Sequence, residues 1–555
     1  MLKSKHINFD NVKPNDKFFS SKQLLFKDKT DLIRNAEKEK NLNFSKKINL
    51  FVFLLTISFA SFVSFNLLKL SYKKEVSKIV SVDRFQTPRG KILDRNNEII
   101  AASLDTKDLY IDVKNSLNKR KLEKELSDIF LEKSSYLKKI FQKEQYSLIK
   151  KDISLSNLNK LKMIGDPAIK LHKSKKRIYP QHNIFSNLIG IKTPNLISKL
   201  EKNLNEVLNK GSDVRLTVDL RIQNIVRDEL YKSLKYYNAK AALAMVMNVN
   251  NGEILAMVSL PDFNPNYPES ILPKTEINLT SEARYEMGST LKIFNAAIVY
   301  ESKHDIEYQK FNISKGYQIT SDKNIVDEHI KKDILNFEEI FIKSSNIGSV
   351  KILESLGDDL QYKFFDKVGL TQKLKVDGLK IVSNKLPNNW ESHSKFISYG
   401  YGLSISPISL VTAFSSMVNG GYKIKPTIVV NKKQTQKVRI LSSDTSKKIN
   451  KLIQKIVNEG TGKKAKVNGI LVGGKTGTSK KVESGNYSEK KKVTSFIGVF
   501  PANYPEYLTF VLFDEPENNI SGSNENTGGN TAAPTFSKIV KKVSPIISKS
   551  NYLKD

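Results

Sequence analysis

A stretch of 21 residues without a charged side chain, residues 48–68, constrains this chain of 555 residues most strongly. Its length is what a helix needs to cross a bilayer. Lysines lie on both sides of it, at positions 46, 47 and 69, which argues against a buried core helix. A cleaved signal peptide is disfavoured because the stretch is too long and begins 47 residues into the chain. We therefore predict one transmembrane anchor, at residues 48–70.

The segment before the anchor indicates which way the chain crosses the membrane. Residues 1–47 hold twelve lysines and arginines against six acidic residues, and their polar composition is typical of a disordered tail. Positively charged flanks stay in the cytoplasm. We expect a cytoplasmic N-terminus and place everything after about residue 71 outside the membrane.

The whole chain is strongly basic, with a formal net charge of +34. Nucleic acid is the usual partner of such a charge, but an exported domain would rarely meet it. Only 11 of the 91 basic residues are arginine, so we attribute the excess of lysine to a coding bias. Anionic wall polymers or lipid headgroups are the secondary interpretation, and we predict no binding of nucleic acid.

Residues that bind cofactors or metals are scarce in this sequence. There is no cysteine, and the six histidines show no metal-binding spacing. A Gly-x-Ser-x-Gly elbow and a phosphate-binding loop are also missing, so the sequence supports neither a hydrolase-fold nor a nucleotide-binding protein. We predict no metal and no cofactor.

Three short motifs occur in a fixed order along the second half of the chain. They are Ser289-Thr290-Leu291-Lys292, Ser344-Ser345-Asn346 and Lys475-Thr476-Gly477-Thr478. Together they predict an acyl-transfer site in which a serine attacks a carbonyl, a lysine takes the proton and the Lys-Thr-Gly strand binds a carboxylate.

Each motif also has an ordinary explanation when it is taken alone. Ser-x-x-Lys recurs at Ser71, Ser116, Ser135 and Ser488, where it describes a solvated surface. Ser289 differs because residues 291–299 read as a buried helix, in which Lys292 would be costly without a function. Burial would keep Lys292 partly neutral and able to act as a base.

The other two motifs are of unequal specificity. Ser344-Ser345-Asn346 taken alone fits a helix N-cap or a polar turn. The third motif follows a short apolar run, residues 471–474, that suits the start of a strand. Gly477 would let the backbone of a ligand pair closely along that strand. The alternative for this motif is a glycine-rich turn beside a surface lysine.

The pattern of predicted helices and strands changes near residue 216. Residues 72–215 alternate strand-like pieces with charged helical stretches and hold no cluster of candidate catalytic residues. After a helical stretch at 221–237, residues 241–258 predict a β-hairpin, and residues 494–500 and 507–512 predict two further strands. We expect these strands to form a sheet with the strand at Lys475, beside a helical lobe.

The chain resembles class B penicillin-binding proteins, the monofunctional peptidoglycan D,D-transpeptidases, and most of all their division (septal) type. The resemblance covers about residues 84–540. Besides the three motifs, it rests on residues 89–96, 177–180, 216–223, 285–288, 406–407, 419–421, 460–462 and 495–498. One segment departs from the family, because residues 189–201 lack the usual glycine-rich lead before Glu201. That departure puts the contacts of the pedestal in question.

The resemblance implies an α+β fold with four parts. These are a cytoplasmic tail (1–47), the anchor (48–70), an elongated pedestal or dimerisation-like domain (71–215) and a β-lactamase-like transpeptidase domain (216–548). In that domain an antiparallel sheet is flanked by helices.

The resemblance also implies a role for each residue of the motifs. Ser289 would form an acyl-enzyme with the penultimate D-alanine of a stem peptide, with Lys292 as its general base. Ser344 would relay a proton, and Asn346 would hold the substrate amide and Lys292. Lys475 would supply positive potential. Thr476 and Thr478, on either side of Gly477, would bind the terminal carboxylate.

The resemblance further implies substrates, inhibitors and partners. The substrates would be peptidoglycan stem peptides, and β-lactams, which mimic them, would trap Ser289. The partners would be a glycan-polymerising membrane protein and a division scaffold.

Several alternatives remain open at this point. An elongation-type transpeptidase has the same chemistry in another complex, and localisation of a tagged protein to septum or sidewall separates the two. A D,D-carboxypeptidase would trim peptides rather than join them. A non-catalytic β-lactam-binding scaffold or sensor would keep the fold without turnover, and a sensor would usually carry several membrane spans. A β-lactamase is disfavoured because nothing identifies a deacylating base.

Overall fold

The computed structural model describes residues 50–67, 88–130, 134–303, 305–321, 323–327, 329–430, 437–483, 485–517 and 526–552. The chain forms two units, Met1–Gln86 and Thr87–Asp555. Within the first unit, the helix Leu50–Leu67 has a mean hydropathy of 2.1 and is long and apolar enough to cross a membrane. It falls inside the predicted anchor. The predicted cytoplasmic tail lies outside the described residues.

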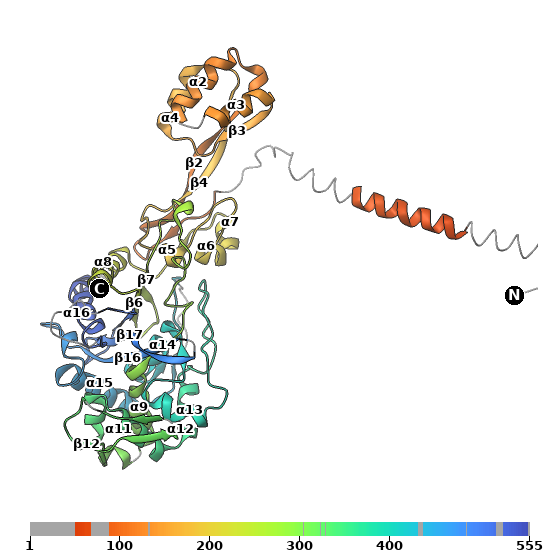
Figure 1. Cartoon of the computed structure of the whole chain (residues 1–555). Helices are drawn as coiled ribbons and strands as arrows, with labels where there is room; N and C mark the ends of the chain where they lie inside the picture. Colours follow the sequence, from red (N-terminus) through yellow and green to blue (C-terminus); the bar gives the residue numbers. More distant parts are fainter. Residues whose placement is uncertain are drawn as a thin grey trace, which may run out of the picture. The chain divides into compact units, whose positions relative to one another are not determined.

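The second unit begins with a five-stranded mixed sheet (Figure 1). Strand β1 (Ile92–Leu93) pairs antiparallel with the long strand β2 (Ile99–Asp112) and parallel with β5 (Val214–Arg215). Further along, β2 pairs on its two edges with β3 (Tyr146–Lys150) and β4 (Ile169–Ile178). This sheet holds together segments that lie more than a hundred residues apart in the sequence.

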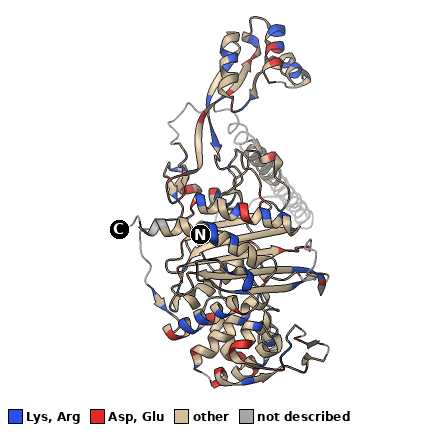
Figure 2. Ribbon diagram, turned by 90° about the vertical axis from the view of Figure 1, so that its left-hand side faces the viewer, with Lys and Arg blue, Asp and Glu red and all other residues tan. Residues whose placement is uncertain are grey.

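Three helices cover one face of the far end of this sheet, and we call the resulting subdomain, residues 108–171, the head. The helices are α2 (Lys119–Phe130), α3 (Ser134–Lys143) and α4 (Leu155–Ile164). The head has its own core because alternate residues of β2 point inward, Leu109 and Ile111 among them, and pack against the apolar faces of the helices. Lysine and arginine residues occur on the head as well as on the rest of the second unit (Figure 2).

A buried carboxylate holds the base of the pedestal together. Glu201 is fully buried, and its two oxygens pair with Arg89 (2.6 Å) and Arg177 (2.7 Å). Arg177 also donates to the backbone oxygen of Gly90 (2.8 Å). The segment that departs from the family therefore still brings its glutamate to two arginines, of which Arg89 precedes β1 and Arg177 lies in β4.

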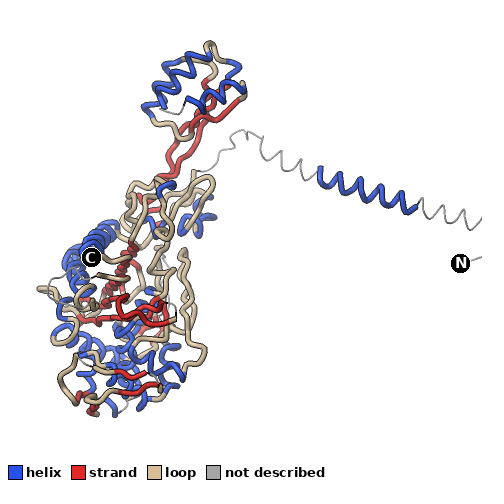
Figure 3. Tube along the Cα trace, viewed as in Figure 1, coloured by secondary structure: helices blue, strands red, loops and turns tan. Residues whose placement is uncertain are grey.

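The C-terminal part of this unit is built on an antiparallel sheet of order β16-β17-β18-β6-β7 (Figure 3). Its strands are β6 (Ala241–Asn248), β7 (Ile254–Leu260), β16 (Gly473–Glu483), β17 (Asn486–Phe500) and β18 (Tyr507–Asp514). The predicted hairpin and the strands predicted near 475, 494 and 507 are all present, so the α+β fold class is confirmed.

Helices cover both faces of this sheet. On one face lie α8 (Leu220–Tyr236) and α16 (Ala532–Tyr552), which pack on Ala242, Ala244 and Val246. The alternate residues Leu243, Met245 and Met247 face the helical part. That part consists of α9 (Lys292–Ser302), α10 (Phe337–Lys343), α11 (Asn346–Leu356), α12 (Asp358–Lys367), α13 (Glu391–Tyr399), α14 (Pro407–Val418) and α15 (Ser443–Asn458).

Short elements complete the unit. They are α5 (Ser186–Ile189), α6 (Lys199–Asn203), α7 (Asn205–Asn209), β8 (Tyr285–Glu286), β9 (Lys310–Asn312), β10 (Tyr317–Thr320), β11 (Lys323–Ile325), β12 (Ile334–Asn336), β13 (Ser404–Ile405), β14 (Tyr422–Lys423) and β15 (Val438–Arg439).

We predict that Glu201→Ala strongly destabilises the second unit. Removing one partner of a buried ion pair leaves uncompensated charge in the interior, which costs about 3–5 kcal/mol. Urea unfolding of residues 87–555 measures the loss. The matched control is Asp359→Ala, which removes a carboxylate paired with Lys363 at the surface (2.8 Å) and should leave the free energy of unfolding almost unchanged. Equal stability of the two variants would contradict a structural role for Glu201.

Candidate active site

Ser289 lies in a tight turn directly before helix α9. Residues Gly288–Leu291 form a 3-10 helix, and Lys292 is the first residue of α9. The sequence predicted a helical turn, and in a 3-10 turn side chains three apart are eclipsed. Ser289 and Lys292 therefore lie on the same side. The Ser289 side chain is half-buried.

Close backbone packing sets the position of this turn. Gly288 has a φ of +52°, and a Cβ there would lie 2.4 Å from the backbone oxygen of Thr478. The Gly288 N–H donates to the backbone oxygen of Gly400 (3.1 Å). On strand β16, a Cβ at Gly477 would lie 2.7 Å from the backbone oxygen of Met287. The Ser289 turn thus rests directly on the backbone of β16.

Lys292 is completely buried beneath the turn. Its ammonium nitrogen donates to Ser344 O (2.5 Å), to Asn346 Oδ1 (2.7 Å) and, at 3.3 Å, to Ser344 Oγ. Burial lowers the pKa of Lys292 to about 7, and the negative charge of Asp327 acts in the opposite direction. A substantial fraction of Lys292 is therefore neutral near neutral pH.

The Ser-Ser-Asn motif forms the corner between two helices. Ser344 ends α10 with a φ of +62°, and Ser345 caps α11 by accepting from the N–H of Gly348 (2.8 Å). The carboxylate of Asp327 accepts from Asn346 N (2.8 Å), Ile347 N (3.2 Å) and the Ser345 hydroxyl. Asp327 holds the corner in place, and sequence reasoning did not find it.

Lys475 approaches the same corner from the sheet. It is also completely buried, and its Nζ donates to Ser344 Oγ (3.0 Å) and to Thr476 O (3.2 Å). Burial lowers the pKa of Lys475 well below its ordinary value, and the nearby charge of Lys292 acts in the same direction. The hydroxyl of Ser344 thus lies within hydrogen-bond distance of two buried lysines.

The two threonines of the third motif have polar partners of their own. Thr476 Oγ1 lies 2.8 Å from Thr461 Oγ1, and Thr478 Oγ1 accepts from the N–H of Gly528 (3.0 Å). Thr461 and Gly528 thus contact the third motif, and the motifs alone did not identify them. Thr461 stands in the 460–462 landmark, whereas nothing in the sequence pointed to Gly528.

The structure joins the predicted site residues in one cluster. Hydrogen bonds connect Lys292, Ser344, Asn346, Lys475 and Thr476. Ser289 and Thr478 join this cluster through the packing of Gly288 on β16. Within the described ranges, no group of three His, Asp or Glu side chains is arranged to hold a metal ion.

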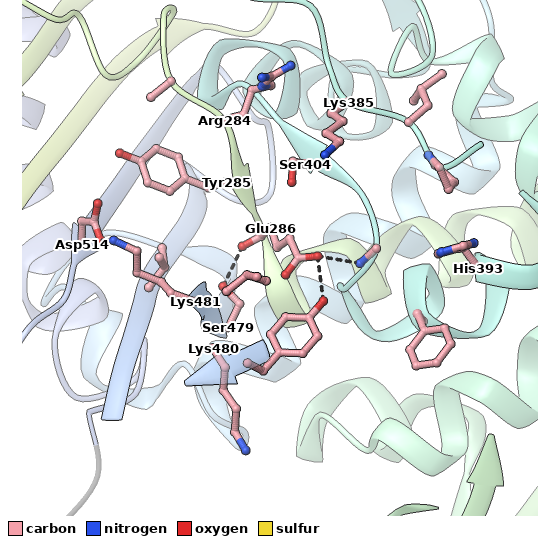
Figure 4. A pocket seen from close by; sticks show the side chains of 18 of the residues that line it. Arg284, Tyr285, Glu286, Lys385, His393, Ser404, Ser479, Lys480, Lys481 and Asp514 are labelled. Atoms are coloured by element: carbon pink, nitrogen blue, oxygen red, sulfur yellow. Dashed lines mark hydrogen bonds and ion pairs between the residues drawn. The ribbon is translucent and has the colours of Figure 1, made fainter. Parts of the chain in front are cut away.

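A groove of about 900 Å³ continues from the end of the third motif along residues 479–482 of β16 (Figure 4). Glu286, three residues before Ser289, lies within it. Its carboxylate accepts from Gly402 N (2.7 Å) and from the hydroxyl of Tyr487 (3.0 Å), and burial raises its pKa. Ser479 Oγ donates to the backbone oxygen of Glu286 (2.7 Å). This network ties the β16–β17 hairpin to the strand that leads into Ser289.

Comparison with known proteins gives two matches to family models. Residues 242–541 match the penicillin binding protein transpeptidase domain, and residues 84–214 match the penicillin-binding protein dimerisation domain.

Individual relatives are similar over most of the chain. A probable peptidoglycan D,D-transpeptidase FtsI of Caulobacter vibrioides is 28% identical, covering 83% of this chain and 81% of the relative. A probable peptidoglycan D,D-transpeptidase PenA of Neisseria gonorrhoeae is 27% identical, with coverage of 86% and 87%. Stage V sporulation protein D of Bacillus subtilis is 28% identical, with coverage of 92% and 86%.

We predict that Asp327→Ala loosens the corner that carries Ser344 and Asn346. Three donors lose their acceptor in the interior, which should lower the free energy of unfolding by at least about 2 kcal/mol. Urea unfolding measures the effect. Asp333→Ala is the control, because Asp333 is exposed and lies in the same segment of the chain. An Asp327→Ala variant as stable as the control would show that the carboxylate does not hold the corner.

Proposed function

The chain belongs to the penicillin-binding protein transpeptidase family, and from this premise we propose that it is a serine-type peptidoglycan D,D-transpeptidase acting in septal wall synthesis. One observation carries the proposal. A completely buried lysine of lowered pKa, Lys292, lies one 3-10 turn after Ser289 and contacts both Ser344 and Asn346. A neutral amine in that place is suited to remove the proton of a serine nucleophile.

The first half of the reaction forms an acyl-enzyme. Ser289 Oγ attacks the carbonyl carbon of the penultimate D-alanine, and Lys292 takes the hydroxyl proton. Backbone N–H groups of Ser289 and Thr478 stabilise the oxyanion. The C–N bond to the terminal D-alanine then breaks. Ser344, which contacts Lys292 and Lys475, passes a proton to the leaving amine.

The second half joins two stem peptides. The amine of a neighbouring stem peptide attacks the ester carbon, a new C–N bond forms, and the C–O bond to Ser289 breaks. The proton lost by that amine returns to Ser289 through Lys292 and Ser344. Before the terminal D-alanine departs, Lys475, Thr476 and Thr478 bind its carboxylate. Gly477 allows the backbone of the donor stem peptide to approach β16.

The setting of the enzyme is part of the same proposal. The apolar helix Leu50–Leu67 anchors the chain in the bacterial inner membrane, with the N-terminus in the cytoplasm and the second unit outside. The septal role is supported by the resemblance to the division type and by similarity to the protein named FtsI. At the septum, a glycan-polymerising protein and a division scaffold would be its partners.

We predict that a penicillin forms a stable covalent adduct with residues 72–555, and that the adduct is lost in Ser289→Ala. The intact mass of the protein after incubation with the β-lactam measures it.

Lys475→Ala should slow acylation strongly, because the carboxylate of the β-lactam loses its cationic partner. Ser135→Ala is the control, since Ser135 begins another Ser-x-x-Lys match, and this variant should react like the wild type. No adduct on folded wild-type protein would favour a scaffold.

We also predict that the acylation rate rises with pH. Lys292 acts as a base only when neutral, and its pKa is about 7. Below that value the rate constant should fall about tenfold per pH unit, and above it the rate constant should level off. Stopped-flow acylation with a fluorescent penicillin between pH 5 and 9 tests this, with Trp390 fluorescence as the check that the fold persists. A flat profile would contradict Lys292 as the base.

A further inference from the structure

The three most exposed large apolar side chains of the described residues all belong to the head. Leu117, Leu155 and Met163 are 82%, 81% and 87% exposed, respectively. Single exposed apolar residues are common on protein surfaces. Three of them on one small subdomain, more exposed than any side chain of the helix Leu50–Leu67, call for a functional explanation.

Two of these side chains, Leu155 and Met163, lie on the exposed side of helix α4. Leu155 and Met163 are eight residues apart on this helix, which corresponds to about 12 Å. Leu117 is fixed near the end of α4, since its N–H (3.2 Å) and the hydroxyl of Ser116 (3.0 Å) both donate to Asp166. The inner side of α4 already fills the core of the head through Leu161. The exposed side chains therefore cannot turn inward.

Basic residues flank this apolar stripe. Lys160 and Lys162 are exposed on α4 itself, and Lys114 is exposed shortly before Leu117. The head as a whole holds fourteen lysines and arginines against nine acidic residues. The carboxylate of Asp166, beside Leu117, accepts from the two donors above and from the N–H of Ala168 (2.8 Å).

We propose that Leu117, Leu155 and Met163, with Lys114, Lys160 and Lys162, form a docking surface for an anionic lipid bilayer, which we call the head patch. Protruding apolar side chains framed by lysines are typical of proteins that lie on a membrane surface. Protein interfaces are instead depleted in lysine, which makes up half of the head patch.

The chain also carries its own means of attachment to a bilayer. The same chain carries a helix able to cross a membrane, and nineteen residues, 68–86, connect it to the second unit. A connection of that length spans up to about 70 Å when extended. The head patch would then give the enzyme a second attachment to the membrane. This proposal does not depend on the chemistry at Ser289.

The absence of cysteine from the chain allows a direct test with the full-length protein. Met163→Cys carries a single environment-sensitive fluorophore, and the protein is placed in phosphatidylcholine bilayers with or without phosphatidylglycerol. Quenching by nitroxide-labelled lipids reports contact with the bilayer. The matched control is Lys170→Cys, which carries the label on β4 beside Tyr110, on the sheet face away from the helices.

We expect a blue shift and quenching at position 163 in bilayers with phosphatidylglycerol, and neither at position 170. Lys160→Gln and Lys162→Gln should each reduce the ratio of docked to free protein about fivefold. Leu117→Gln should reduce docking without changing its dependence on phosphatidylglycerol. A label at position 163 that stays in water on both bilayers would overturn the proposal and indicate a protein partner for the head patch.

Discussion

The structure depends on burying two lysine side chains against one hydroxyl group. Lys292 and Lys475 are both completely enclosed, and both donate to Ser344 Oγ, at 3.3 and 3.0 Å. A buried ammonium without compensation costs several kcal/mol, and a second positive charge nearby raises that cost. This cost of burying the charged form is why the pKa values of both lysines are lowered. The result is a serine-containing site with a neutral base available and no histidine.

The helical part and the sheet of the C-terminal part together position and enclose these two lysines. The helical part contributes Lys292 and the corner at Ser344, whereas the sheet contributes Lys475 from its edge strand β16. The corner stays in place because Asp327 ties Ser345 and the start of α11. Burial of this extent requires a large core on both sides, which explains why the three motifs are spread over almost two hundred residues.

The sequence predicts those parts of the fold and of the site that are encoded by local patterns. The hairpin at 241–258 and the buried helix after Ser289 are encoded by continuous apolar runs, and the three motifs are short and ordered. Asp327 was missed because its function arises only when its loop folds back onto α11. The groove beside Glu286 was missed for a similar reason, since strands and loops from four separate segments line it. The pairing of Glu201 with two arginines likewise depends on tertiary contacts.

The way in which Ser289 is positioned follows from backbone packing rather than from side chains. Gly288 and Gly477 bring the turn that carries Ser289 and strand β16 so close together that a single added Cβ would overlap a backbone oxygen. Side chains can change rotamer, but two backbones in contact cannot move apart without breaking the sheet edge or the start of α9. The N–H groups proposed for the oxyanion hole therefore keep a fixed separation before substrate arrives. Preorganised dipoles of this kind cost no rearrangement during the reaction, which is why they lower its barrier effectively.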